Sequence, residues 1–207
     1  MKGKKVIVFD FDGTLADSKK AYVETIYHTL MLHSYIYSKN RIIKALGPKL
    51  EDSLKNLARF PPNEIKKIKN EINHKILMLA KSLKPCPYVK NTLKRIHKKG
   101  NHLILLTNSA RKFCFVFLKH NNLLNYFEKR FYAENFSDKE HVIRNLAKEY
   151  RIPVKEIVYV GDRMKDVNTA RKSGCKIIIS LSCSWDKPKV RGKIYTIKDF
   201  SQLEARL

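Results

Sequence analysis

The chain has 207 residues, of which 43% are hydrophobic, and 43 Lys and Arg face 19 Asp and Glu, for a formal net charge of +24. This length suits one compact domain, or one domain that carries a modest insertion. The hydrophobic share excludes a disordered protein, and seven Gly and seven Pro exclude collagen-like and low-complexity chains.

The first predicted strand is the apolar run 6–9, and a long helical insert follows it. From residue 18 to residue 84 the pattern is helical, most clearly where Ile and Leu recur at helical spacing (Ile65, Ile68, Ile72, Ile76, Leu79 and Leu83). Asn63 is expected to cap that helix. An insert of this length exceeds an ordinary loop. We therefore expect a helical cap at 18–84, and a core formed by 1–17 and 85–207.

Beyond the insert, strands and helices alternate. Apolar runs predict strands at 103–106, 157–160 and 177–181, with weaker candidates at 131–133 and 195–197. One intervening helix is expected to begin with a Ser-x-x-Glu capping box formed by Ser137 and Glu140. This alternation predicts the α/β class, with a doubly wound parallel sheet.

The basic excess is spread along the chain. Residues 14–84 carry a net charge of +8 over 71 positions, and the other 136 positions carry +16. A dedicated nucleic-acid surface would concentrate the charge. The even spread favours a compositional bias, although we expect non-specific binding to polyanions at low salt.

The cysteines and the hydropathy pattern indicate the cellular compartment in which the protein works. Four cysteines (Cys86, Cys114, Cys175 and Cys183) lie far apart and form no C-x-x-C pair, so they suit neither a disulfide framework nor a zinc site. No apolar run approaches the roughly 20 residues that span a bilayer, and the run at 6–9 is too short for a signal peptide. These features predict reduced, mostly buried thiols in a cytoplasmic protein with no membrane partner.

Polar residues follow three of the predicted strands. Asp10 and Asp12 follow the first, Thr107 and Asn108 the second, and Asp162 a third, with Asp166 four residues further on. In a doubly wound sheet these strand ends meet where ligands bind. Clustered carboxylates need a cation, and their hard oxygen ligands favour Mg²⁺ over zinc. With Lys139 on the same rim, the set suits phosphoryl transfer.

The segments that carry these residues resemble four motifs of the haloacid dehalogenase superfamily. The first is Asp-Phe-Asp-Gly-Thr-Leu-Ala-Asp-Ser at 10–18, the second Leu-Leu-Thr-Asn at 105–108, the third Lys139, and the fourth Val-Gly-Asp-Arg-Met-Lys-Asp at 160–166. The similarity covers nearly the whole chain. Phosphoglycolate phosphatase-like members with a small helical cap are the most similar, which implies a Rossmann-like core.

The resemblance implies a role for each matching residue. Asp10 would be the nucleophile that forms an aspartyl-phosphate, and Asp12 would protonate the leaving group and then activate water. Thr107 and the Asn108 backbone would hold the phosphoryl group, and Lys139 would brace it together with Asp10. Mg²⁺ would be held by Asp10, the Asp12 carbonyl and Asp162, with Asp166 in support.

We therefore expect a Mg²⁺-dependent phosphatase for small phosphorylated metabolites, such as phosphoglycolate or a sugar or nucleotide monophosphate. Lys49, in a Gly-Pro-Lys turn of the cap, and Arg111 and Arg163, which follow site residues, are candidate substrate contacts, although each is also compatible with a surface or structural role. The alternatives are a phosphomutase, or a nucleic-acid-binding or polynucleotide end-phosphatase protein on the same scaffold.

Overall fold

The computed structural model describes residues 3–47, 49–189 and 194–207. The strands in these residues are β1 (Val6–Phe9), β2 (His102–Leu106), β3 (Lys129–Phe131), β4 (Val158–Gly161), β5 (Lys176–Ser180) and β6 (Tyr195–Ile197). The α-helices are α1 (Lys19–Leu32), α2 (Lys39–Ala45), α3 (Leu50–Leu57), α4 (Pro62–Leu79), α5 (Val89–Lys98), α6 (Arg111–His120), α7 (Lys139–Glu149) and α8 (Met164–Ser173). Four short 3₁₀ helices are η1 (Leu124–Tyr126), η2 (Val154–Glu156), η3 (Phe200–Gln202) and η4 (Glu204–Arg206).

The six strands form one parallel sheet in the order β3-β2-β1-β4-β5-β6, which confirms the α/β class. β1 is central, and Phe9 at its end lies opposite Leu105 of β2 and Val160 of β4. The carboxyl ends of these three strands are therefore level. The chain order reverses around β1, which is the position where such sheets bind ligands.

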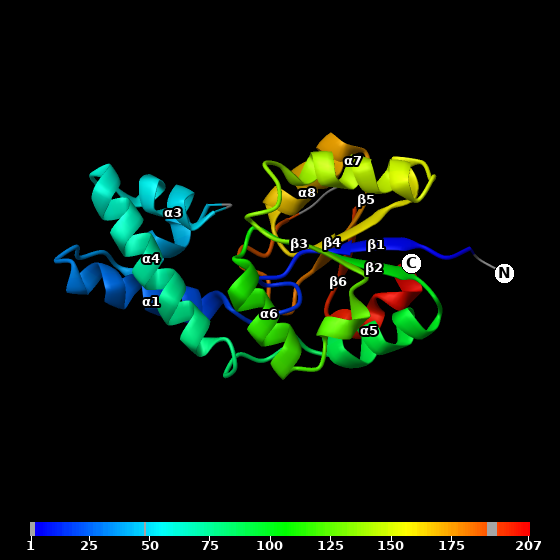
Figure 1. The fold of residues 1–207 in the computed structure, drawn as a ribbon, viewed down its shortest axis with the longest axis horizontal. Helices are drawn as coiled ribbons and strands as arrows, with labels where there is room; N and C mark the ends of the chain where they lie inside the picture. Colours follow the sequence, from blue (N-terminus) through cyan, green and yellow to red (C-terminus); the bar gives the residue numbers. More distant parts are fainter. Residues whose placement is uncertain (1–2, 48, 190–193) are drawn as a thin grey trace.

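Two apolar layers cover the sheet. On one face, alternate strand residues such as Val8 and Ile104 pack against α7 and α8. On the other face, residues such as Phe9 and Leu105 pack against α5 and α6. Figure 1 shows these helix pairs on opposite sides of the sheet, with both termini at the end away from α1–α4.

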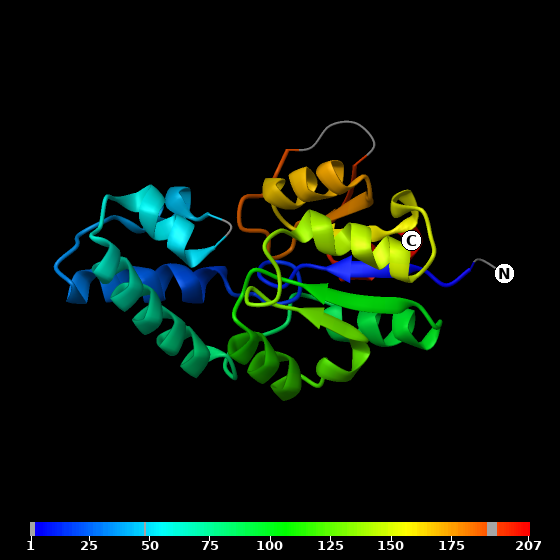
Figure 2. The ribbon, with the colours of Figure 1, turned by 45° about the horizontal axis from the view of Figure 1, so that its top comes forward.

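The helices α1–α4, called the cap below, lie beyond the carboxyl ends of the strands (Figure 2). The chain enters and leaves the cap along paired segments, because the Asp17 N–H donates to the Lys84 carbonyl at 3.0 Å and the Cys86 N–H donates to the Leu15 carbonyl at 2.9 Å. Ile68, Ile72 and Ile76 of α4 are buried, as their spacing predicts. The boundaries at 18 and 84 stay a prediction.

Two helix starts and one strand differ from expectation. Asp138, not Ser137, caps α7, since its carboxylate accepts the His141 N–H at 2.6 Å. Asn63 lies inside α4, which begins at Pro62, because a proline at the first helical position needs no N–H partner. β3 begins two residues before the expected run, because an edge strand can carry polar residues such as Lys129 and Arg130 toward solvent.

The four cysteines are free thiols, and three of them are buried. None of the helices formed by the described residues is both long enough and apolar enough to cross a membrane.

Candidate active site

The loop after β1 is a tight turn that brings Asp10 and Asp12 to the sheet edge. The Phe11 carbonyl accepts the N–H groups of Leu15 at 2.8 Å and Ala16 at 3.0 Å. Gly13 has a φ of +76°, and a Cβ there would lie 2.3 Å from a carboxylate oxygen of Asp162. Glycine is therefore required both by the backbone conformation and by the close approach of Asp162.

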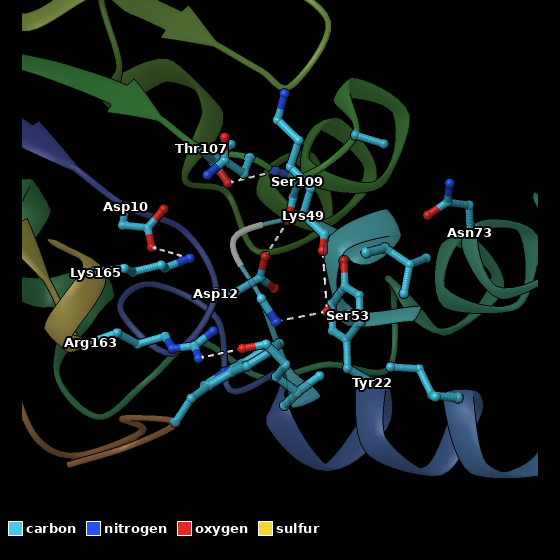
Figure 3. A pocket seen from close by; sticks show the side chains of 17 residues that line it. Asp10, Asp12, Tyr22, Lys49, Ser53, Asn73, Thr107, Ser109, Arg163 and Lys165 are labelled. Carbon is cyan, nitrogen blue, oxygen red and sulfur yellow. Dashed lines mark hydrogen bonds and ion pairs between the residues drawn. The ribbon is translucent and has the colours of Figure 1, made fainter. Parts of the chain in front are cut away.

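Asp10 is buried at the floor of the site between Lys139 and Lys165, and Figure 3 shows Lys165 beside it. Its Oδ1 accepts a hydrogen bond from Lys139 Nζ at 2.8 Å, and its Oδ2 lies 3.9 Å from Lys165 Nζ. Burial alone would raise the pKa of Asp10, but the two ammonium groups outweigh it and hold the pKa below its usual value. Asp10 is therefore ionised at neutral pH, as a nucleophile must be.

A second hydrogen bond fixes Lys139, because its ammonium also donates to the Tyr159 hydroxyl at 2.7 Å. The Tyr159 hydroxyl in turn donates to Asp166 Oδ1 at 3.1 Å. The other oxygen of Asp166 accepts the backbone N–H groups of Asp162 at 3.2 Å and Arg163 at 3.0 Å. Asp166 thus holds the first turn of α8 against the end of β4.

Asp10, Asp162 and Asp166 form a buried acidic cluster, with one carboxylate oxygen of each within 4.8 Å of the others. Burial, and then the neighbouring carboxylates, raise the pKa values of Asp162 and Asp166. Asp162 is oriented by the Trp185 N–H at 2.8 Å and by the Thr14 hydroxyl at 3.4 Å. The Asp12 carboxylate lies outside this cluster.

The residues present fit a hard divalent cation. Asp10 Oδ2 is buried and has no hydrogen-bond partner among the described residues, which would be costly for a carboxylate oxygen that nothing binds. It belongs to an all-oxygen cluster of three carboxylates, the donor type that Mg²⁺ prefers. The cluster can therefore hold a metal ion.

Two hydroxyl groups orient Asp12. Ser18 donates to Asp12 Oδ1 at 2.5 Å, and Ser109 donates to Oδ2. Burial raises the pKa of Asp12 to about 6, although the two serine hydrogen bonds oppose the rise. A carboxyl with this pKa can give and take a proton near neutral pH.

The loop after β2 completes the floor. Thr107 is buried, and its hydroxyl oxygen accepts the Ser109 N–H at 3.0 Å. Asn108 lies beside it, and both residues line the same cavity as Asp10 and Asp12. The structure therefore brings Asp10, Asp12, Thr107 and Asn108 together.

The cap closes the cavity from above. Tyr22 and Ile26 of α1, Leu50 and Ser53 of α3, and Asn73 of α4 line it. Tyr22 also packs against Trp185 of the core, with ring centroids 5.4 Å apart.

The three candidate substrate contacts have different environments. Lys49 is exposed but lines the cavity, whereas Pro48 beside it lies outside the described residues. Arg163 lines the cavity too, but its guanidinium donates to the Leu46 carbonyl at 2.9 Å and so links the core to the cap. Arg111 is exposed and is not among the residues that line the cavity, and its backbone N–H donates to the Glu134 carboxylate at 3.1 Å.

Sequence reasoning missed several residues of the site. Lys165 lies between the two aspartates of the fourth motif, and Tyr159 lies within an apolar strand. Ser18 ends the first motif and Ser109 directly follows the second, but nothing in the sequence pairs them with Asp12. Only Lys165 offered a usable signal, since its position in the first turn of a helix that follows Asp162 directs it to the strand ends.

A model of the haloacid dehalogenase-like hydrolase family matches residues 7–180. A phosphoglycolate phosphatase of Vibrio vulnificus (strain CMCP6) is 27% identical over 193 residues, covering 83% of this chain and 81% of that protein. The pyrophosphatase PpaX of Halalkalibacterium halodurans is 24% identical over 177 residues, covering 84% of this chain and 81% of that protein.

Among solved structures, a protein described as a predicted phosphoglycolate phosphatase of Haemophilus somnus 129pt superposes with a TM-score of 0.88. The sequences are 20% identical, and the match covers 100% of this chain and 99% of the other, so the fold is shared over the full length. The match of the family model over most of the chain decides the family. The chain belongs to the haloacid dehalogenase-like hydrolases, and its relatives from Vibrio vulnificus and Halalkalibacterium halodurans are named a phosphatase and a pyrophosphatase.

Proposed function

We propose that the chain is a Mg²⁺-dependent phosphatase that hydrolyses a small phosphorylated metabolite through an aspartyl-phosphate on Asp10. The observation that carries the proposal is the environment of Asp10: an ionised carboxylate, buried at the floor of a capped cavity, held by Lys139 and adjoining two further carboxylates. Mg²⁺ bound by Asp10, Asp162 and Asp166 would offset the charge that develops on the phosphoryl oxygens.

The residues around Asp10 divide the remaining work. Asp10 attacks the phosphorus, while Asp12 gives a proton to the leaving oxygen and later takes one from the water that hydrolyses the aspartyl-phosphate. Ser18 and Ser109 hold the Asp12 carboxylate for both steps. Thr107 and the Asn108 backbone bind the phosphoryl group, and Lys139 keeps Asp10 oriented.

The position of the cap over Asp10 favours a small substrate over a polymer. α1, α3 and α4 each contribute side chains above Asp10, and Arg163 ties the cap to the core at the rim. A metabolite fits under such a roof, whereas the end of a polymer would require the cap to open. We propose that 18–84 acts as this substrate-selecting cap.

The relatives point to two substrate types. The name of the Vibrio vulnificus protein suggests 2-phosphoglycolate, and that of the Halalkalibacterium halodurans protein suggests inorganic pyrophosphate. Both are small and anionic, and the basic Lys49 at the cavity wall suits either one. We propose 2-phosphoglycolate as the first substrate to test.

A panel of phosphate esters tests the proposal. The purified protein is incubated with p-nitrophenyl phosphate, 2-phosphoglycolate, pyrophosphate, and sugar and nucleotide monophosphates, with Mg²⁺ and with EDTA. Phosphate release that requires Mg²⁺ is expected. No Mg²⁺-dependent release from any compound would reject the proposal, and an isomerised sugar phosphate without phosphate release would identify a phosphomutase instead.

A further inference from the structure

The two lysines beside Asp10 are held very differently. Lys139 is buried and makes two hydrogen bonds, to Asp10 and to Tyr159, so its ammonium is committed to the protein. Lys165, in the first turn of α8, is partly exposed, and its ammonium lies 3.9 Å from Asp10 Oδ2, which is beyond hydrogen-bond distance. Among the described residues it has no hydrogen-bond acceptor.

The position of Lys165 is central to the cavity. It lines the capped cavity with Asp10 and Thr107. It also lines a second cavity, together with Lys139 and Asp166. Figure 3 shows its side chain directed at Asp10 from below. A group that bonds to Asp10 from the capped cavity would therefore lie within reach of the Lys165 ammonium.

Once a divalent cation is bound, the positive charge of Lys165 is not needed to neutralise the acidic cluster. When they hold a divalent cation, the carboxylates of Asp10, Asp162 and Asp166 carry three negative charges, and Asp12 is neutral in the protonated form that gives a proton to the leaving group. A divalent cation and Lys139 together supply three positive charges. The charge of Lys165 is then available to a ligand, and a phosphate monoester is a dianion that needs such compensation.

The other cations of the cavity are less suitable. The guanidinium of Arg163 already donates to the Leu46 carbonyl, lies 3.4 Å from Asp186 and stacks over the Trp185 ring. Lys49 is exposed and belongs to the cap. Among the described residues that line the cavity, Lys165 alone combines a free donor with proximity to Asp10.

We propose that Lys165 is a second phosphoryl-binding residue, whose ammonium donates to an oxygen of the group that Asp10 attacks. This inference rests on the proposed phosphatase function. The geometry supports it: the Lys165 ammonium lies 3.9 Å from Asp10 Oδ2 and lines the same cavity, so it faces the position that the phosphoryl group would take. The competing role is that of a counter-ion, which would offset the acidic cluster only until a metal ion binds.

Binding experiments separate the two roles without turnover. Lys165→Met removes the charge and keeps the length, and Lys165→Arg keeps the charge. Lys148→Met makes the same change at an exposed position of α7 that lines none of the cavities described. Calorimetric titrations measure the affinity for inorganic phosphate at saturating Mg²⁺, and the affinity for Mg²⁺ without phosphate.

Lys165→Met should bind phosphate about tenfold to a hundredfold more weakly, because a charge-assisted hydrogen bond is lost. Its affinity for Mg²⁺ should be unchanged or tighter, Lys165→Arg should retain most of the phosphate affinity, and Lys148→Met should match the wild type. Unchanged phosphate binding by Lys165→Met would overturn the inference, as would a parallel loss of Mg²⁺ affinity. Tighter Mg²⁺ binding with unchanged phosphate affinity would identify the counter-ion role.

Two controls keep the result interpretable. Thermal unfolding reports whether each variant folds. If Lys165→Met does not fold, Lys165→Gln takes its place. Unchanged phosphate binding by Lys165→Gln would overturn the inference equally. A wild-type protein that neither binds phosphate nor hydrolyses any ester contradicts the proposed function itself. A wild-type protein that does both, beside a Lys165→Met variant with equal phosphate affinity, contradicts only the role of Lys165.

Discussion

The cavity has a floor, formed by the core at the strand ends, and a roof, formed by the cap, and the two hold their polar groups in different ways. On the floor, Asp10 and Asp12 after β1 and Asp162 after β4 are each held by two or more named partners. In the roof, Lys49 and Asn73 are exposed on the cap and face the cavity among apolar side chains. Preorganised groups suit bond-making steps, whereas adaptable ones suit the choice of substrate. Substitutions in the floor should therefore affect every substrate alike, and those in the roof should affect them unequally.

The largest effect is expected from Asp10→Asn at the centre of the floor. An amide cannot form the aspartyl-phosphate, so turnover of every substrate should fall by roughly four orders of magnitude or more. Steady-state assays across the substrate panel measure the loss, and circular dichroism confirms that the fold is intact. Turnover close to wild type in a folded variant would rule out Asp10 as the nucleophile.

Asp12→Asn should have the next largest effect, about 10²- to 10⁴-fold on turnover, because the leaving group and the attacking water lose their proton partner. The loss should be smaller for formation of the aspartyl-phosphate from p-nitrophenyl phosphate, whose leaving group needs little help. Asp17→Asn, in the same loop but exposed, is the matched control and should keep wild-type turnover. Equal losses in the two variants would show that a general change in the loop is responsible.

The floor was largely predictable because its residues directly follow apolar strands. The strand runs place Asp10, Thr107 and Asp162, and parallel pairing makes those strand ends level. Lys139 was predicted through the resemblance, and its bond to Asp10 agrees with the expected position. Lys165 was missed because its one signal, a position in the first turn of the helix that follows Asp162, is easily overlooked among 32 lysines.

The roof was not predictable in the same way. Helical spacing identifies the buried stripe of α4, but the residues that face the cavity, such as Asn73, depend on how α1, α3 and α4 pack on one another. Arg111 illustrates the same limit: its position after the second motif suggested a substrate contact, but the direction in which α6 begins leaves its side chain exposed and away from the cavity.

Asn73→Ala tests the role of the roof. We expect it to change the preference between substrates and to leave the rate of the bond-making steps unchanged. Losing one amide contact should change the ratio of kcat/KM between two substrates by about three- to tenfold, the range of a single neutral hydrogen bond. Asn70→Ala, one turn earlier on α4 and exposed, is the matched control. A uniform fall in kcat for all substrates would place Asn73 with the floor instead.

The smallest effect concerns the surface charge, which belongs to neither region. A net charge of +24 without a concentrated patch should give weak, sequence-independent binding to a labelled oligonucleotide that disappears as salt rises. Fluorescence anisotropy over a salt titration measures it. Tight binding at physiological salt, or removal of a terminal phosphate from the oligonucleotide faster than from every metabolite, would favour a nucleic-acid function over the metabolite phosphatase.

Trapping the covalent intermediate tests the central claim most directly. The Asp12→Asn variant, in which hydrolysis of the aspartyl-phosphate should be slow, is mixed with Mg²⁺ and p-nitrophenyl phosphate, whose leaving group needs no proton donor, then quenched in acid and digested for mass spectrometry. The peptide that carries Asp10 should gain the mass of one phosphoryl group, and the same peptide from Asp10→Asn should not. A phosphoryl group on another residue, or none on the enzyme while wild-type turnover proceeds and the variant is folded, would contradict the account.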